Sequence, residues 1–339
     1  MSSVGDVARA TDTGGVSAYR SRFSQGATFT PRVLVTVRRE VAGPLGLAAG
    51  TTKVRSARSN LEKRPWKQLP DQTGVVEDQF VHTMLTGAAI VGYKVRTPEL
   101  TIIPRIGDGL LEGSDSSLDG FPGMAAWWRG AERLWDRHKS SRSTMSLLGR
   151  LNFQRGLESQ LPPAALRVVY TTSGQYLAAC IVDDDKAVID SSLYWAAVDT
   201  LPEARYLCAV LNSDTLLALV RPLQARGEHN PRHFHLIPFD LPIPAYDATN
   251  PTHEELATLA QDAQTVVDGL LFDPARRFEL ARRQVREGLA ASGISAAIDN
   301  AVATILNLPP GAVPRAGDVL DLEIHLSGAA PRDEELVGA

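Results

Sequence analysis

Cysteine is scarce in this sequence: the 339 residues include two, Cys180 and Cys208, each within an apolar segment (LAACIV and YLCAVL). This scarcity excludes a disulfide framework and a Cys-x-x-Cys metal or redox motif. Both cysteines are predicted to be small buried hydrophobic side chains, which suits a reducing cytoplasm. No apolar run reaches the roughly 18 residues of a membrane span, and the polar N-terminus lacks the apolar core of a signal peptide. We therefore expect a cytoplasmic protein without membrane contact.

The motifs of common catalytic sites are also absent. The sequence contains no P-loop, dinucleotide fingerprint, HExxH or Gly-x-Ser-x-Gly motif, while a Ser/His/Asp triad stays open. A methyltransferase needs a glycine-rich turn after its first strand to bind S-adenosylmethionine, and an amino-group DNA methylase also needs Asn/Asp-Pro-Pro-aromatic to hold the base. Here Pro-Pro occurs only in QLPPAAL and NLPPGAV. We expect no cofactor and no catalytic residue in this chain.

A marked excess of either charge is missing too, since 35 lysines and arginines face 39 acidic residues and leave a formal net charge of −4. If the chain binds nucleic acid, the positive charge must therefore be local. One such segment is 53–69, which carries six basic residues against one acid, a local charge of +5.

What the chain has in plenty is apolar residues, 44% of its length, which is enough for a sizeable core, and the length itself favours two domains. Strand patterns come first and helical patterns mostly later, which predicts an α+β fold with a mixed, twisted β-sheet, flanking helices and a long C-terminal helical segment. The predicted divisions are a disordered N-terminus (1–18), an N-terminal α+β part (19–150), a core domain (151–250), a helical segment (251–308) and a flexible tail (309–339).

Local patterns place the elements. Alternating apolar and polar residues predict a strand over 29–40, and 77–95 is expected to form a short helix, a glycine break and a strand. A helix is predicted over 122–141, with Trp128 and Trp135 in the core. Further along the chain we expect a hairpin over 166–184, more β structure over 187–199, buried helices in 203–223 broken near 212–214, a helix over 252–271 started by a Thr252/Glu255 capping box, and one more helix with a basic face.

Two segments are rich in groups that bind DNA. KRPWKQ places Lys63, Arg64 and Lys67 around Trp66, as in a phosphate clamp, although the tryptophan itself is more typical of a core. Arg137 and Lys139, on the outer sides of the helix over 122–141, are candidates to approach the same backbone.

The second segment is QARGEHNPRHFHLIPFDLPIP (224–244), which supplies many donors that reach base edges and phosphates. We expect a loop of DNA-contacting donors followed by a proline-rich edge strand (241–244) that fixes its geometry. Its candidate donors are Gln224, Arg226, Asn230, Arg232 and His233.

Other polar groups have plainer interpretations. Metal binding by His229, His233 and His235 is not expected, because no cysteine lies near and arginine separates them. DDDK (183–186) is expected to be a solvated hairpin end rather than a nuclease metal site. Thr172 and Ser173, at the tip of the hairpin over 166–184, either read bases or simply form the turn.

The segment 166–247 resembles the C-terminal target-recognition region of bacterial N6-adenine DNA methylases of the restriction–modification type. The pattern that carries the resemblance is Asn212-Ser213, then Arg226-Gly227, Arg232-His233-Phe234 and Leu241-Pro242-Ile243-Pro244. The segments FSQGATFTPRVLVTV, KRPWKQL and FPGMAAWWRGAERLWDRHKS are similar to those that precede this region in the same family, so the resemblance covers roughly 19–270. The last proline-rich segment is also similar to specificity subunits of type I systems. The catalytic methylase domain that should lie upstream is absent from this sequence.

The resemblance implies a target-recognition module that binds double-stranded DNA, with the core domain (151–250) as its centre. Methyl transfer would need a partner catalytic chain and the S-adenosylmethionine bound to that partner. The alternative from another class is a protein–protein adaptor or decoy derived from such a module, without a DNA role. The implied DNA-contacting residues are Lys63, Arg64, Lys67, Arg137, Lys139, Thr172, Ser173, Gln224, Arg226, Asn230, Arg232 and His233.

Overall fold

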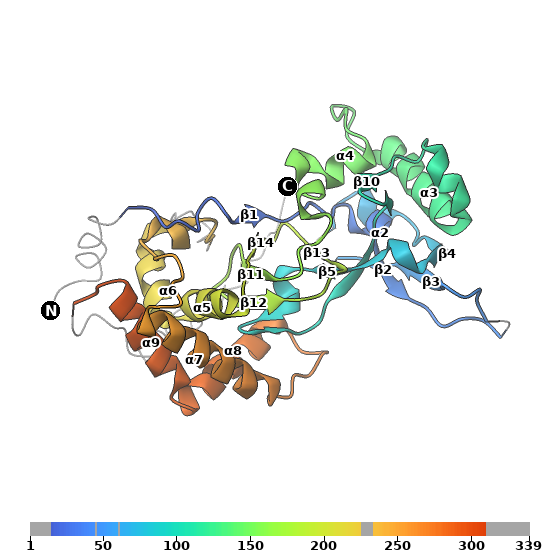
Figure 1. Cartoon of the computed structure of the whole chain (residues 1–339). Coiled ribbons are helices and arrows are strands. Elements are labelled where there is room, and N and C mark those ends of the chain that lie inside the picture. Colours follow the sequence, from blue (N-terminus) through green and yellow to red (C-terminus); the bar gives the residue numbers. More distant parts are fainter. Residues whose placement is uncertain (1–14, 45, 60–61, 225–232, 310–339) are drawn as a thin grey trace, which may run out of the picture.

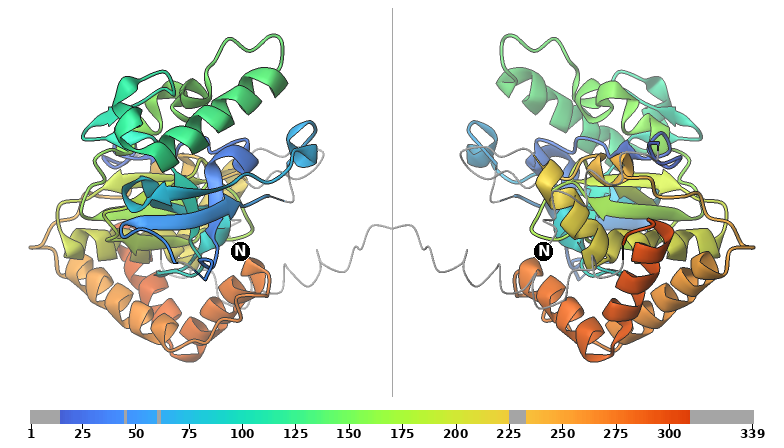
Figure 2. Two further views of the ribbon diagram at one scale, coloured as in Figure 1. Left: turned by 90° about the vertical axis from the view of Figure 1, so that its right-hand side faces the viewer. Right: turned by 90° about the vertical axis from the view of Figure 1, so that its left-hand side faces the viewer.

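A mixed six-stranded sheet and an antiparallel four-stranded sheet form the middle of the molecule (Figure 1). The computed structural model describes residues 15–44, 46–59, 62–224 and 233–309. Helix α3 lies at one end of the molecule and helices α7, α8 and α9 lie at the other, with the sheets between them (Figure 2). The predicted α+β fold is confirmed.

The six-stranded sheet has the strand order β13-β5-β8-β2-β3-β4, and only the pair β13 and β5 is parallel. A buried cluster joins this sheet to three helices, and the indole nitrogen of Trp127 donates to the carbonyl of Leu34 at 3.1 Å. The strands are β2 (Thr36–Arg39), β3 (Thr51–Ser56), β4 (Thr73–Glu77), β5 (Val81–Leu85), β8 (Glu99–Ile102) and β13 (Ala187–Ile189), and the helices are α2 (Arg32–Val35), α3 (Pro122–His138) and α4 (Leu147–Leu151).

The four-stranded sheet, ordered β1-β14-β11-β12, carries the larger core. Five helices pack on it, and Tyr170, Tyr206 and Phe239 are fully buried among them. The strands are β1 (Ser24–Gln25), β11 (Arg167–Thr171), β12 (Ala179–Val182) and β14 (Leu193–Ala197); the helices are α5 (Leu201–Asn212), α6 (Asp214–Val220), α7 (Pro251–Asp268), α8 (Phe278–Ala291) and α9 (Ile294–Ile305).

Smaller elements complete the described part of the chain. Two short hairpins pair β6 with β7 and β9 with β10. Their strands are β6 (Ile90–Val91), β7 (Lys94–Val95), β9 (Arg105–Ile106) and β10 (Gly109–Leu110), and the 3-10 helices are η1 (Trp66–Gln68), η2 (Asp78–Phe80), η3 (Gly87–Ala89), η4 (Ser116–Gly120), η5 (Phe153–Arg155), η6 (Glu158–Gln160), η7 (Arg221–Leu223) and η8 (Ile237–Asp240).

The predicted helices and strands between residues 166 and 223, and the two helices that follow residue 251, are confirmed. The hairpin of β11 and β12, the β structure of β13 and β14, the two buried helices α5 and α6, and the helices α7 and α8 all occur where the sequence predicts them. The helix over 122–141 is also confirmed as α3, with Trp128 and Trp135 buried. Both cysteines are free and buried, and DDDK forms the turn between β12 and β13.

Two N-terminal predictions are wrong. Segment 29–40 is not one strand, because α2 forms first and buries three consecutive apolar residues, Val33, Leu34 and Val35, where a strand would turn every second one away from the core. Segment 77–95 contains no α-helix: β5 lies inside the sheet between β8 and β13, and its almost unbroken burial removes the alternation that marks a half-exposed strand.

Two finer predictions are also wrong. Asn250, not Thr252, caps α7, since its side chain accepts the backbone N–H of Thr252 at 2.9 Å. Segment 241–244 forms no strand, because its two prolines offer no N–H to a ladder. Side chains bind its carbonyls instead: Ser17 donates to Ile243 at 2.8 Å and Tyr206 donates to Pro244 at 2.9 Å.

Within the described ranges no single helix is long and apolar enough to cross a membrane. Helices α8 and α9 reach that length and hydropathy only when joined, with a bend of 84° between them.

Candidate nucleic-acid interface

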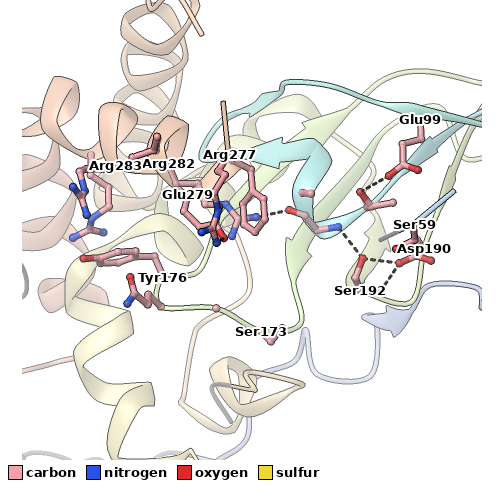
Figure 3. A pocket seen from close by; sticks show the side chains of 18 of the residues that line it. Ser59, Glu99, Ser173, Tyr176, Asp190, Ser192, Arg277, Glu279, Arg282 and Arg283 are labelled. Atoms are coloured by element: carbon pink, nitrogen blue, oxygen red, sulfur yellow. Dashed lines mark hydrogen bonds and ion pairs between the residues drawn. The ribbon is translucent and has the colours of Figure 1, made fainter. Parts of the chain in front are cut away.

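A cavity of about 900 Å³ lies where the two sheets and helix α8 meet (Figure 3). The β11–β12 hairpin, the first turns of α8, the residues after β5 and after β13, and the segment after β3 all contribute to its wall. Three carboxylates and six arginines line it, an excess of three positive charges: Glu99, Asp190 and Glu279, with Arg32, Arg58, Arg277, Arg282, Arg283 and Arg286.

Some of these arginines are neutralised by carboxylates. Arg58 pairs with Asp71 at 2.6 Å, and Arg286 binds Asp214 through both oxygens at 2.7 and 3.0 Å. Arg277 pairs with Glu279 at 2.8 Å, but its side chain is 82% exposed, so this pair contributes little.

Arg282 and Arg283 are not paired with a carboxylate among the described residues. Arg282 is buried, and its Nε and Nη2 donate to the carbonyl oxygens of Gly87 and Ile90, so helix α8 is bound to the loop between β5 and β6. Burial lowers the pKa of Arg282 to about 10, which still leaves it protonated at neutral pH. Arg283 is exposed and forms no ion pair with the described residues.

The opposite wall holds hydrogen-bond acceptors and hydroxyl groups. Arg32 binds Glu99 at 2.7 Å and lies 3.9 Å from Asp190. Asp190 accepts the hydroxyl of Ser192 at 2.6 Å, and that hydroxyl accepts the backbone N–H of Gly87 at 2.8 Å. Figure 3 shows this end of the cavity facing the arginines of α8. The cavity therefore has a cationic end and an acceptor end.

Four of the predicted DNA-contacting residues meet at the tip of the β11–β12 hairpin. Ser173 forms an antiparallel bridge with His233, and the N–H of Phe234 donates to Thr172 at 2.8 Å. Gln224 donates to the carbonyl of His233 at 3.2 Å. Residues far apart in sequence thus form one cluster, called the recognition cluster after its predicted role (Thr172, Ser173, Gln224 and His233), and Ser173 also lines the cavity.

The predicted phosphate clamp lies in the loop between β3 and β4. Lys63, Arg64 and Lys67 are exposed, and their side chains form no ion pair with the described residues. Arg58 donates to the carbonyls of Trp66 and Lys67, both at 3.2 Å, while lining the cavity itself. The loop that carries the clamp cations is therefore joined to the cavity wall.

The end of α3 meets this loop through an aromatic contact. Trp66 stacks on Trp135 with ring centroids 5.4 Å apart, as a packed tryptophan should. Arg137 is exposed in the last turn. Lys139 is less available, because its amine binds Asp136 at 2.9 Å and the carbonyl of Met145 at 3.0 Å.

Arg226, Asn230 and Arg232, with His229, lie outside the described residues. His233 and His235 stack on each other at 5.1 Å, and among the described residues no three His, Cys, Asp or Glu side chains are placed to hold a metal ion.

The part of the cavity wall formed by α8 was not predicted from the sequence. PARRFELARRQVREG shows a basic face, but only the fold brings Arg282 and Arg283 opposite Asp190, about ninety residues earlier in the chain. Arg58 lies within the +5 segment and could have been included on that signal.

No family model matches the chain, and no curated protein matches it. Solved structures that resemble it include two restriction enzymes. The type IIL restriction-modification enzyme MmeI in complex with DNA is 12% identical with a TM-score of 0.48, over 74% of this chain and 31% of its own. The type IIG restriction endonuclease BpuSI is 14% identical with a TM-score of 0.40, over 92% of this chain and 34% of its own. This chain thus spans about a third of either enzyme. Because both TM-scores lie below 0.5, the function proposed below rests on this chain's own residues.

Proposed function

We propose that the chain is the DNA-binding, target-recognition part of an N6-adenine DNA methyltransferase of the restriction–modification type. It binds double-stranded DNA and selects the site, while a partner chain supplies the methyl transfer and the S-adenosylmethionine. The sequence resemblance suggests this role, and the arrangement of the cationic groups supports it.

One observation carries the proposal. The clamp loop, the recognition cluster and helix α8 come from distant parts of the sequence, yet Arg58, Ser173 and Arg283 all line the same cavity. In a chain of net charge −4, this gathering of cations is local, as an electrostatic footprint for a polyanion requires.

The clamp cations and the recognition cluster have different surroundings. Lys63, Arg64 and Lys67 are exposed without ion pairs to described residues, which suits phosphate contacts that fix position but read no sequence. In the recognition cluster, Ser173, Gln224 and His233 offer hydroxyl, amide and imidazole groups, which suits contacts to base edges. Thr172, also predicted to contact DNA, is buried and donates its hydroxyl to the carbonyl of Ser192 at 3.1 Å, so it supports the hairpin tip instead.

The experiment is a salt titration of duplex binding. Replacing Lys63 or Lys67 with alanine should weaken binding to all duplexes alike and reduce the log–log salt slope by about one. Lys186→Ala, at an exposed position of the β12–β13 turn, is the matched control and should leave the slope unchanged.

Selection of bound sequences from a random pool then tests recognition. Replacing Arg226 or Arg232 should cost roughly 1–3 kcal/mol on the preferred site and relax the choice at one position. His233→Ala and Gln224→Ala should act in the same direction.

If the pool yields no preference, or if clamp and loop variants weaken every duplex equally, the chain does not recognise a target. Absence of salt-dependent binding would favour a protein–protein adaptor or decoy. The purified chain should neither bind S-adenosylmethionine nor methylate DNA alone, and stoichiometric micromolar cofactor binding in calorimetry would contradict this part.

A further inference from the structure

We propose that the cavity binds one phosphorylated nucleotide unit, with the phosphate at the α8 wall and the donor groups of the base or sugar at Glu99 and Asp190. The nucleotide is either an unpaired nucleotide of a DNA strand or a free mononucleotide. The first case deepens the proposed function and rests on it, whereas the second stands without it.

The size of the cavity fits a small molecule. Its volume of about 900 Å³ lies within the range of roughly 300–1,000 Å³ that is typical of ligand pockets. Gly174 has a φ of 142°, which side chains rarely adopt, and it keeps the hairpin backbone close to Arg282.

The cationic wall suits a phosphate. Arg282 donates to carbonyl oxygens through Nε and Nη2 and forms no ion pair among the described residues; the nearby Glu279 is itself paired with Arg277. Arg283 is the next residue and forms no ion pair with described residues. Two guanidinium groups at one end of a partly enclosed space form charge-assisted hydrogen bonds with phosphate oxygens.

Flat surfaces lie beside this wall. The guanidinium of Arg282 lies 4.6 Å from the ring centre of Phe278, and that of Arg286 lies 3.8 Å from the ring centre of Tyr176. Bases stack on aromatic rings and on arginine planes.

The acceptor wall favours a nucleotide over an acidic peptide as the ligand. Glu99 accepts Arg32 on both oxygens and the hydroxyl of Thr86 on one, and Asp190 accepts the N–H and the hydroxyl of Ser192 on one oxygen. Each carboxylate offers about four lone-pair sites, so both retain acceptor capacity. These carboxylates repel a second carboxylate but accept the amino groups of a base or the hydroxyl of a sugar. A ligand with a phosphate at one end and donors at the other matches both walls (Figure 3).

Calorimetry on the full chain tests this with deoxyadenosine monophosphate, deoxyadenosine, inorganic phosphate and an acidic peptide. A second arm compares a fully paired duplex with the same duplex carrying one unpaired adenosine. Arg283→Ala should weaken nucleotide or unpaired-duplex binding roughly tenfold and leave nucleoside binding unchanged. Glu99→Gln should weaken nucleotide and nucleoside alike.

Arg276→Ala is the matched control, because Arg276 is a neighbouring arginine, 72% exposed, that lies outside the cavity wall. Its affinities should equal those of the unmodified chain. All three variants replace side chains at the surface or at the cavity rim, and an unchanged Tm confirms that each one folds.

Saturable mononucleotide binding that falls in Arg283→Ala supports the free-nucleotide source. A preference for the unpaired duplex that disappears in the same variant supports the DNA source. Absence of both, equal effects of Arg276→Ala and Arg283→Ala, or tighter binding of the acidic peptide overturns the proposal. If the paired duplex binds in a salt-dependent way but neither effect is seen, the proposed function stands and this inference is refuted. If the mononucleotide binds but no duplex does, this inference stands and the proposed function is refuted.

Discussion

The indole rings of Trp66 and Trp135 lie nearly parallel, with centroids 5.4 Å apart and 10° between their planes. His138 meets the ring of Trp66 edge-on at 6.2 Å. The loop between β3 and β4 is thereby fixed against the last turns of α3. Lys67 and Arg137, some seventy residues apart in the sequence, therefore lie at the same end of the molecule.

Replacing Trp66 with alanine should therefore affect stability and DNA binding together. Loss of a half-buried stacked indole should lower the free energy of unfolding by about 1–3 kcal/mol, and duplex affinity should fall because the clamp cations lose their support. Urea titration and duplex binding measure the two effects. Trp66→Phe is the control and should restore most of both; a Trp66→Ala variant with unchanged duplex affinity would exclude a role of this loop in binding.

Arg58 holds the same loop by its polar groups. Arg58→Lys keeps the charge but loses the planar fork that reaches the carbonyls of Trp66, Lys67 and Leu69. We expect a more open loop and therefore faster trypsin cleavage after Lys63 and Lys67 under native conditions. Cleavage after Lys186, in the β12–β13 turn, should keep its rate and serves as the internal control. Equal acceleration at Lys186 would mean that the change is global.

Arg282 joins α8 to the loop between β5 and β6. Its replacement by alanine leaves the buried carbonyls of Gly87 and Ile90 without their charged donor, so the free energy of unfolding should fall by about 2–3 kcal/mol. Arg283→Ala, one residue away and exposed, should change it by less than about 0.5 kcal/mol. Denaturation curves of the two variants decide the point, and equal stabilities would show that the hydrogen bonds of Arg282 contribute nothing net.

The helices of the second half could be predicted because their apolar residues repeat with helical spacing and turn residues separate them. Segment 77–95 could not be predicted, since β5 is covered on both faces and a buried strand loses the alternation that distinguishes it from a helix. Local sequence gives no information on what covers a strand.

Part of the candidate site could likewise be predicted from the sequence, and part could not. KRPWKQ and the hairpin tip could be named because their residue types are unusual in sequence. The cavity could not, because Arg283, Asp190 and Arg58 come to line one space only when α8 packs beside the β11–β12 hairpin and the loop after β5. The bridge between Ser173 and His233 likewise depends on the return of a distant segment.

Asp299 on α9 is a buried carboxylate behind the Asp214–Arg286 pair. Its side chain accepts the N–H of Thr215 at 2.9 Å. Burial, and then the nearby charge of Asp214, raise its pKa to about 6, above the value of about 3.9 in an unfolded chain. The folded state therefore binds the proton more tightly than the unfolded state does. Stability from this group is complete at low pH and is lost as the pH rises from about 4 through 6.

Asp299→Asn should remove this loss, because the amide stays neutral and its oxygen can still accept the N–H of Thr215. Above pH 6 the variant should be more stable than the unmodified chain, on the order of 2–3 kcal/mol, whereas near pH 4 the two should be similar. Urea titrations at pH 4 and pH 7.5 measure the difference. Burial lowers the pKa values of His82 and His253, so the stability that these two residues contribute is lost as the pH falls. Both residues are present in the variant and in the unmodified chain, so their contributions cancel in the comparison. Asp185→Asn, at an exposed position of the β12–β13 turn, should show no such dependence on pH. If Asp299→Asn instead lowers the stability at both pH values by the same amount, the carboxylate stabilises the fold in its charged form and the predicted direction of the pH dependence is wrong.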